Sequence, residues 1–456
     1  MSQPIAAIAT AAVPSAIGIL RLSGDGAIEA VSAVFRPASG RALAVYESRR
    51  LVYGTLLGPD GAPIDQALAT LSRAPHSYTG EDTAEIQCHG SPAVLALGLE
   101  ALFAQGVRQA GPGEFTRRAF LNGRLDLLQA EAVADLIDAE TPAAVRQAAG
   151  QLSGALGRRV GAVYDGLVDL MAHFHAVLDY PDEDIDPFRA DTIRTGLEKA
   201  RAGLEGLLAT YDRGRYVAGG VPCVLVGRPN AGKSSLLNAL VGYDRAIVTD
   251  VPGTTRDTVE ARCRLGGLLL RLIDTAGLRD TEDAVERIGV ERSRAALEEA
   301  ALALLVVDGS EPLTAEDRAA MDEAARVPRV LCLVNKSDRP LAVELEELRA
   351  RFPRLRVVSA ATGAGLEALG EDVAALFPAG GTEAAGELLT NARQADAARR
   401  ALEAVERAGG SLEGGLTPDA LLLDVEEALG ALGELTGARV REDVTDRIFA
   451  RFCVGK

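Results

Sequence analysis

The sequence has no tryptophan, and its 456 residues include only five cysteines, three methionines and four lysines. The cysteines are Cys88, Cys223, Cys263, Cys332 and Cys453, an odd number of widely spaced residues with no C-x-x-C pair. This pattern excludes a disulfide framework and a zinc site built on paired cysteines. Because its thiols are expected to stay reduced, the chain is predicted to be cytoplasmic.

Long apolar runs are also missing. The longest, Ala300–Val307, ends at Asp308 and is far shorter than the roughly 20 residues that a membrane span needs. Residues 1–20 are apolar but carry no basic segment and contain two prolines, so we interpret them as two short strands around a loop, not as a signal peptide. The sequence therefore predicts a protein without a membrane segment.

Positive charge is scarce: 48 Lys and Arg face 65 Asp and Glu, which gives a net charge of −17. No segment is basic, since the basic and acidic counts are 9 and 10 for residues 1–120, 10 and 16 for 121–219, 20 and 25 for 220–378, and 9 and 14 for 379–456. Such a chain repels phosphate backbones, which excludes a stand-alone nucleic-acid binder that relies on bulk electrostatics.

Lysine is much rarer than arginine, and occurs only as Lys199, Lys233, Lys336 and Lys456. Together with the richness in alanine and glycine, this indicates a coding bias that replaces lysine wherever arginine serves equally well. The remaining lysines are therefore candidates for chemically required positions, and three of the four lie in the motifs below.

The hydrophobic periodicity changes along the chain and divides it into four segments. Residues 1–120 alternate short β-like runs with turns and one helical stretch, which predicts an α+β domain. Residues 121–219 and 379–456 have helical periodicity and predict one discontinuous helical bundle. Residues 220–378 alternate buried strands with helices, which is typical of a parallel doubly wound sheet, here inserted into the helical domain. We expect strands near residues 5–9, 17–22, 51–57, 67–71, 84–88, 223–226, 268–273, 302–307, 330–334 and 356–358.

The most specific motif is a phosphate-binding loop. Residues 227–234 read Gly-Arg-Pro-Asn-Ala-Gly-Lys-Ser, match G-x-x-x-x-G-K-S, and directly follow an expected strand. In such a loop, backbone N–H groups wrap the phosphates, Lys233 neutralises β- and γ-phosphate charge, and the Ser234 hydroxyl binds Mg²⁺. The candidate nucleotide-binding residues of the loop are Asn230, Ala231, Gly232, Lys233, Ser234 and Ser235.

Three later segments complete a predicted nucleotide site. Asp274, Thr275, Ala276 and Gly277 follow a strand and offer a carboxylate for Mg²⁺ and an amide for the γ-phosphate. Asn335-Lys336-Ser337-Asp338 follows the strand expected at residues 330–334. The two oxygens of Asp338 can accept the N1–H and the exocyclic amine of guanine, a pattern that adenine does not offer. Ser359 and Ala360 follow the last strand and would add backbone N–H groups to a guanine pocket.

Over residues 221–377, the order and spacing of these motifs resemble the translation-factor-like class of P-loop GTPases, so a Ras-like domain is expected. The usual water-orienting glutamine is replaced by Leu278, which has no donor or acceptor for a water, so another group must orient the nucleophile. Asn230 and residues 249–257 resemble GTPases in which K⁺ takes the place of an arginine finger. On that resemblance, the K⁺ ligands would be Asn230, Thr254 and the backbone oxygens of Thr249 and Val251, Thr255 would join Ser234 on Mg²⁺, and Asp250 would also contact the nucleotide.

The flanking segments resemble one family. Arg21-Leu-Ser-Gly24, Tyr78-Thr-Gly-Glu-Asp82, residues 120–131 and the terminal Phe452-Cys-Val-Gly-Lys456 are similar to the bacterial tRNA uridine-5-carboxymethylaminomethyl modification GTPases, the MnmE or TrmE family. This resemblance covers the whole chain. It implies a homodimer with K⁺- and Mg²⁺-dependent GTP hydrolysis that works with an FAD-containing MnmG subunit on the tRNA wobble uridine. The one-carbon unit would come from a tetrahydrofolate derivative, 5,10-methylene or 5-formyl.

The resemblance also implies roles for single residues outside the GTPase motifs. Arg21, Glu85, Arg124 and Lys456 would contact the folate, with a reactive Cys453 nearby, and Glu286 would orient the water that Leu278 cannot. Judged by residue type alone, Glu286 is a solvated helical carboxylate and Cys453 an inert apolar side chain. The resemblance favours the catalytic role for Glu286 and leaves both interpretations of Cys453 open.

Two other functions stay open from the sequence. A ribosome-assembly or RNA-chaperone GTPase usually carries a second G domain or a basic RNA-binding appendage, and the sequence shows neither. A folate-dependent one-carbon transferase regulated by GTP would share the motifs but act without RNA.

Overall fold

The computed structural model describes residues 2–179, 190–243, 260–273, 296–377, 385–414, 418–438, 445, 448–450 and 452–455. The chain divides into two compact units, residues 1–134 with 426–456, and residues 135–425.

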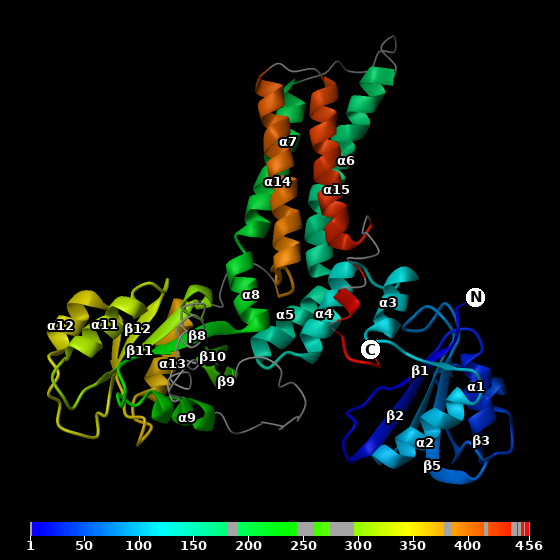
Figure 1. Cartoon of the computed structure of the whole chain (residues 1–456). Helices are drawn as coiled ribbons and strands as arrows, with labels where there is room; N and C mark the ends of the chain where they lie inside the picture. Colours follow the sequence, from blue (N-terminus) through cyan, green and yellow to red (C-terminus); the bar gives the residue numbers. More distant parts are fainter. Residues whose placement is uncertain are drawn as a thin grey trace, which may run out of the picture. The chain divides into compact units, whose positions relative to one another are not determined.

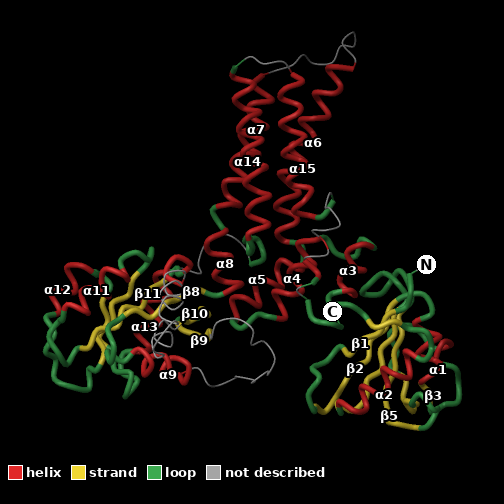
Figure 2. The backbone as a smooth tube through the Cα atoms, in the orientation of Figure 1, coloured by secondary structure: helices red, strands yellow, loops and turns green. Residues whose placement is uncertain are grey.

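The first unit contains a seven-stranded sheet with the order β3-β4-β5-β6-β2-β1-β7. Figure 2 draws the strands in yellow. Its strands are β1 Ile5–Ile8, β2 Ser15–Ser23, β3 Phe35–Pro37, β4 Val52–Leu57, β5 Pro63–Ser72, β6 Thr83–Gly90 and β7 Arg108–Gln109. Its helices are α1 Ala27–Val34, the short 3₁₀ helix η1 Leu43–Val45, α2 Pro92–Phe103, α3 Glu114–Leu121, most of α4 Leu127–Ile137 and the part of α15 Pro418–Thr436 that begins at Glu426. All strand pairs are antiparallel except that of β7 with β1.

The core beside this sheet is formed by alternate side chains of its strands. In β6, Ala84, Ile86 and Cys88 are buried while the residues between them are less so, as expected when successive side chains point to opposite faces. The buried side packs against α1 and α2. All five strands expected in this segment are present, and residues 5–23 form two strands around a loop as predicted.

The helical region joins parts of the chain that lie far apart in sequence. Its helices include α5 Pro142–Leu152, α6 Ala155–Asp179, α7 Ala190–Leu208, α8 Tyr211–Gly219, α14 Ala392–Glu413 and α15 Pro418–Thr436. Helix α7 packs against α6 and α14 (Figure 1). The buried Gln147 on α5 donates to Leu388 O at 3.2 Å and accepts from Gly386 N at 2.8 Å, so the two helical segments are tied together as predicted.

The inserted segment forms a six-stranded sheet with the order β13-β12-β11-β8-β10-β9. Its elements are β8 Val221–Val226, α9 Lys233–Tyr243, β9 Glu260–Leu265, β10 Leu268–Ile273, β11 Leu302–Asp308, α11 Ala315–Ala324, β12 Val330–Asn335, α12 Leu345–Arg351, β13 Leu355–Val357 and α13 Leu366–Leu376. Five strands are parallel, as expected for a doubly wound sheet, and β9 at one edge pairs antiparallel with β10. The physical reason is the two-residue turn Gly266-Gly267, whose φ values of 60° and 79° suit a tight hairpin.

Helices cover both faces of this sheet, as its doubly wound prediction required. Buried residues of α9 and α13 pack on one face, and buried residues of α11 and α12 pack on the other. Strand β8 lies between β10 and β11, so later strands are added to the sheet on both sides of β8. The carboxyl end of β8 is therefore the place where a doubly wound sheet binds ligands.

Among the helices of the described ranges, none is both long enough and apolar enough to cross a membrane.

Candidate functional site

The phosphate-binding loop follows β8 and leads directly into α9. Lys233, the first residue of α9, donates from Nζ to Gly227 O at 2.7 Å and to Arg228 O at 2.9 Å. These bonds hold the amine across the mouth of its own loop, where it would face an anion bound at the helix N-terminus. Ser234 and Ser235 are exposed in the first turn of α9, so their hydroxyls are accessible to a ligand.

Asn335 fixes the phosphate-binding loop to the end of β12. Its buried side chain donates from Nδ2 to Ala231 O at 3.0 Å and accepts from Ala360 N through Oδ1 at 3.0 Å. Gly232 lies so close that an added Cβ would stand 2.2 Å from Asn335 Nδ2. A single side chain thus joins three of the segments that the sequence predicted to share a nucleotide.

Lys336 makes a second connection between the same two loops. Its Nζ donates to Asn230 O at 3.0 Å and to Asp308 Oδ2 at 2.5 Å. Lys336 and Asn230 both have left-handed backbones, with φ of 65° and 61°, a conformation that costs a non-glycine residue about 1 kcal/mol or more. The contacts between the loops offset that cost and fix their shape.

Asp338 is exposed and is oriented by a buried neighbour. Ser359, which is fully buried, donates from Oγ to Asp338 Oδ1 at 2.5 Å. This hydrogen bond lowers the pKa of the Asp338 carboxyl, so the side chain is ionised at neutral pH. An ionised, oriented carboxylate is a hydrogen-bond acceptor of the kind that can receive two N–H groups from a planar base.

The structure thus brings together the predicted residues Asn230, Ala231, Gly232, Lys233, Ser234, Ser235, Asn335, Lys336, Asp338, Ser359 and Ala360. The remaining candidates of this site lie outside the described residues: Thr249, Asp250, Val251, Thr254, Thr255, Asp274, Thr275, Ala276, Gly277 and Glu286.

A second cluster of predicted residues lies on the sheet of the first unit. Arg21 on β2 and Glu85 on β6 are cross-strand neighbours, and Arg21 Nε donates to Glu85 Oε1 at 2.7 Å. Both side chains are about a quarter exposed, at 25% and 27%. The pair therefore forms a preassembled cation and anion at a partly open position, which suits a ligand with both polar edges and a carboxylate.

The terminal segment reaches the same place. Gly113 N donates to Cys453 O at 3.2 Å, Pro112 and Val454 form an antiparallel bridge, and Arg21 Nη1 donates to Gly455 O at 3.2 Å. Cys453 itself is exposed, unlike the other four cysteines. The structure thus places the Cys453 backbone near the Arg21–Glu85 pair, while Lys456 lies outside the described residues.

Two residues that the sequence did not single out individually as site residues border Arg21. The Phe115 ring lies under its guanidinium, 6.0 Å from Cζ, and the Tyr78 hydroxyl is 3.0 Å from Thr116 Oγ1 on the same helix, α3. Tyr78 is 44% exposed, so its ring is accessible to a ligand. The signal was available, because Tyr78 opens one of the segments that resemble the family.

Arg124 belongs to a loop that packs on the turn after Tyr78. Asn122 Nδ2 donates to Thr79 O at 2.7 Å, and a Cβ on Gly80 would stand 3.2 Å from Arg124 Cγ. The Arg124 side chain is exposed. The segments 78–82 and 120–131 are therefore neighbours in space, with the Arg124 guanidinium accessible to a ligand.

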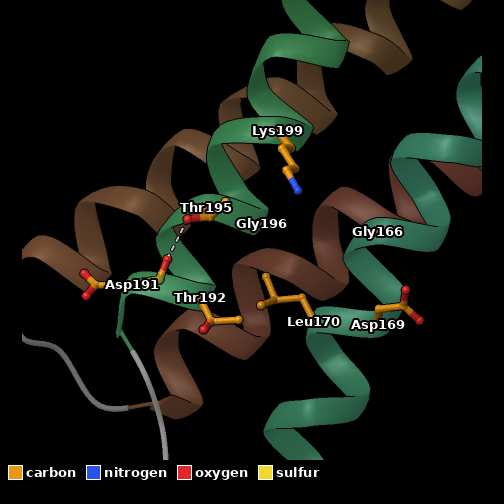
Figure 3. Close-up of a pocket in the computed structure, with 8 residues that line it drawn as sticks. All are labelled: Gly166, Asp169, Leu170, Asp191, Thr192, Thr195, Gly196 and Lys199. Atoms are coloured by element: carbon orange, nitrogen blue, oxygen red, sulfur yellow. Dashed lines mark hydrogen bonds between the residues drawn. The ribbon is translucent and has the colours of Figure 1, made fainter.

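One cavity in the helical region belongs to neither cluster. It is an open hollow of about 570 Å³ between α6 and α7, lined by Gly166, Asp169, Leu170, Asp191, Thr192, Thr195, Gly196 and Lys199. Figure 3 shows that Asp169 and Asp191 point away from each other, so the two carboxylates do not converge on one point. We assign no chemistry to this hollow.

Comparison with known proteins identifies the family. A family model described as the MnmE helical domain matches residues 127–453, and one described as the GTP-binding protein TrmE N-terminus matches residues 4–124. The chain is 46% identical over 456 residues to the tRNA modification GTPase MnmE of Symbiobacterium thermophilum, covering 100% of this chain and 99% of that protein. The proteins of the same name from Chloroflexus aurantiacus and Thermus thermophilus are 46% and 47% identical, each over 100% of both chains. These matches extend over both site clusters and show that the chain belongs to the MnmE (TrmE) family of tRNA modification GTPases.

Proposed function

We propose that this protein hydrolyses GTP to drive the modification of tRNA. The observation that carries the proposal is the joining of residues 227–235, 335–338 and 359–360 by the side chains of Asn335 and Lys336. This arrangement offers loop amides and Lys233 to phosphates and an ionised Asp338 to guanine. Family membership supplies the tRNA part of the proposal.

The finer form of the proposal names the product and the partners. Working as a cytoplasmic homodimer with an FAD-containing, MnmG-type subunit, the protein would help install a carboxymethylaminomethyl group at C5 of the wobble uridine. Because no segment of this chain is basic, the partner subunit would supply most of the affinity for tRNA phosphates.

The deciding experiment is mass spectrometry of tRNA wobble nucleosides from a strain that lacks the gene. We expect the modified uridine to disappear and to return with the intact gene but not with the Asp338→Ala variant. Unchanged wobble nucleosides would refute the proposal: ribosome precursors that accumulate would then favour an assembly GTPase, and a purely folate-linked defect would favour a one-carbon transferase.

In the proposed hydrolysis, the hydroxyl of Ser234 would bind Mg²⁺, which prefers oxygen ligands. Ser234 is exposed in the first turn of α9. Lys233 and the loop amides would bind and orient the phosphates, while K⁺ would supply positive charge to the developing transition state. Among the proposed K⁺ ligands, Asn230 lies in the part of the chain that the structure describes. The other proposed K⁺ ligands are Thr249, Val251 and Thr254, and Thr255 is proposed to join Ser234 on Mg²⁺. GTP hydrolysis should be at least about tenfold faster in K⁺ than in Na⁺ at equal ionic strength, and equal rates would remove K⁺ from the proposal.

Glu286 is proposed to orient the attacking water, because Leu278 cannot. The Glu286→Ala variant should bind GTP normally and hydrolyse it at least about a hundredfold more slowly. Normal turnover in that variant would exclude the role.

The cluster around Arg21 is proposed to hold a tetrahydrofolate derivative. The fit rests on chemistry present in the structure: a cation–carboxylate pair for the polar edges, the exposed Tyr78 ring for stacking, and the Arg124 guanidinium for a carboxylate. When bound, the folate would supply the one-carbon unit, and Lys456 and a reactive Cys453 would lie beside it. A titration with 5-formyl-tetrahydrofolate should show at least about tenfold weaker binding to Arg124→Ala, whereas equal affinity would exclude Arg124 from the site.

A further inference from the structure

The carboxylate of Asp308 lies at the end of β11, between the two loops that contain Asn230 and Lys336. It is only 3% exposed, although it carries a charge. A buried carboxylate requires several partners, because its removal from water is costly. In the sequence, Asp308 belongs to none of the nucleotide motifs and is distinguished only by its position at the end of an apolar run.

The two oxygens of Asp308 have separate tasks. Oδ1 accepts from Ser310 N at 3.0 Å and from Ser310 Oγ at 2.7 Å, which caps the turn after β11. Oδ2 faces two cations: Lys336 Nζ lies at 2.5 Å and Arg228 Nη2 at 3.7 Å. One oxygen therefore shapes the local backbone, and the other receives charges from elsewhere in the domain.

Arg228 comes from the phosphate-binding loop itself. Its Nε lies 3.2 Å from Asp317 Oδ1 at the start of α11, and its Nη2 lies 2.6 Å from Glu311 Oε2. Asp317 is as buried as Asp308, whereas Glu311 is 57% exposed. The guanidinium is thus fixed to β11 and α11 from within the domain.

Lys336 comes from the segment proposed to bind guanine. The same Nζ that contacts Asp308 donates to Asn230 O in the phosphate-binding loop. Asp308 Oδ2 therefore lies between one cation of the phosphate-binding loop and one cation of the base-binding loop. Without its negative charge, the two cations would approach each other with no anion between them.

We propose that Asp308 is a positioning residue that couples phosphate binding to guanine binding, by holding Arg228 and Lys336 in one charge cluster. The proposal rests on the proposed GTP site and extends it to a residue outside the motifs predicted to contact the nucleotide. Its consequence is that the two loops form one preassembled surface, so the base and the phosphates of GDP or GTP reinforce each other's binding.

Asp308→Asn is the sharpest probe, since asparagine keeps Oδ1 for Ser310 and replaces only the oxygen that faces the cations with an NH₂ group. Binding of fluorescent GDP should weaken at least about tenfold, because a donor then faces two donors. The same change in a Lys336→Ala background should weaken binding by less than about threefold, since the coupling partner is already gone. An equal fold-change in the two backgrounds would show that Asp308 acts only on the fold and would overturn the proposal.

Two matched variants control for local disturbance. Ser310→Ala removes a hydroxyl that donates to Asp308 Oδ1. Glu311→Gln removes the exposed negative charge that contacts Arg228. Both should leave GDP affinity within about twofold of the original chain. A loss as large as that of Asp308→Asn in either variant would also contradict the proposal.

Thermal unfolding of the full chain shows whether Asp308→Asn folds. If it does not, Arg228→Gln takes its place in the same pair of backgrounds, with the same expectation: a loss of GDP affinity that depends on Lys336. The proposed function is tested separately with Asp338→Asn, which should exchange guanine for xanthine specificity. If that exchange fails, guanine binding by Asp338 is wrong, whatever the result for Asp308.

Discussion

Gly232 shows how closely the nucleotide loops approach each other at the scale of one residue. Its φ of 100° suits glycine, and a Cβ would meet Asn335 Nδ2 at 2.2 Å. We expect Gly232→Ala to move the Asn335 side chain away from Ala231 O and to weaken GDP binding at least about tenfold, with about 1–3 kcal/mol of lost stability. Isothermal titration with GDP and urea unfolding of the same variant measure the two effects.

Gly242 provides the matched control for this prediction. It lies near the end of α9, the helix that begins directly after Gly232, and nothing within 4 Å would meet a Cβ. Gly242→Ala should therefore keep GDP affinity and should not lower stability. If Gly232→Ala bound GDP as well as Gly242→Ala, the close contact with Asn335 would have no functional weight.

The predictability of the site from sequence follows the same local logic. Lys233, Asn335 and Asp338 were predictable because each stands at a fixed spacing after a strand, where its chemistry is specific. Asp308 and Arg228 were not, since their roles come from contacts between elements that are distant in sequence. Phe115 was missed for the same reason: it is a core-type residue whose ring becomes relevant only through its position under Arg21.

At the scale of an element, the start of α3 depends on one carboxylate. Glu114 accepts from Arg108, from Arg118 and from Gly111 N. Burial alone would raise the pKa of Glu114, but these hydrogen bonds and charges outweigh it and hold the pKa at about 2, below its ordinary value of 4.5. A carboxylate with a lowered folded-state pKa stabilises the protein above its unfolded-state pKa and loses that contribution as the pH falls towards 2.

We therefore expect Glu114→Gln to lower the free energy of unfolding by roughly 2 kcal/mol at pH 7, and the gap to the original chain to narrow as the pH falls from 4.5 towards 2. Urea unfolding of both proteins at pH 7, 5 and 3.5 measures this difference in unfolding free energy. Glu100→Gln, at an exposed position of α2, is the control and should leave stability unchanged at each pH. A gap that stays constant over this range would contradict the assigned ion-pair cluster.

The elements themselves were predictable where one pattern persisted. The five strands expected in the first unit and the five expected in the second were found close to their expected bounds. The short elements α1, β3, β7 and α3 were missed. A helix of eight residues has only about two turns, and a strand of two or three residues shows no alternation that a pattern could reveal. β9 was missed although its residues Glu260–Leu265 alternate polar and apolar side chains, because the strands expected in this sheet were the continuous apolar runs.

At the scale of the whole molecule, the chain leaves its helical region to form a complete α/β domain and then returns. The packing, however, extends one helix beyond the sheet. Tyr216 on α8 is 7% exposed and packs within the core formed by β8, β10 and α13. Its ring meets Phe377 edge-on, with 5.2 Å between the centroids and 80° between the planes. The segment that folds as one unit therefore includes α8.

A comparison of two fragments tests this extension. Residues 211–377 and residues 221–377 share every strand of the sheet, and only the longer one contains Tyr216. Burial of a tyrosine ring with an edge-on aromatic partner contributes about 2–3 kcal/mol, so the shorter fragment should be less stable by about that amount in urea. Tyr216→Ala in the longer fragment should reproduce the loss, whereas Tyr216→Phe should cost much less because it keeps the ring contact with Phe377. Equal stability of the two fragments would place α8 outside the core of the domain, and the helix would then serve only as a connection to the helical region.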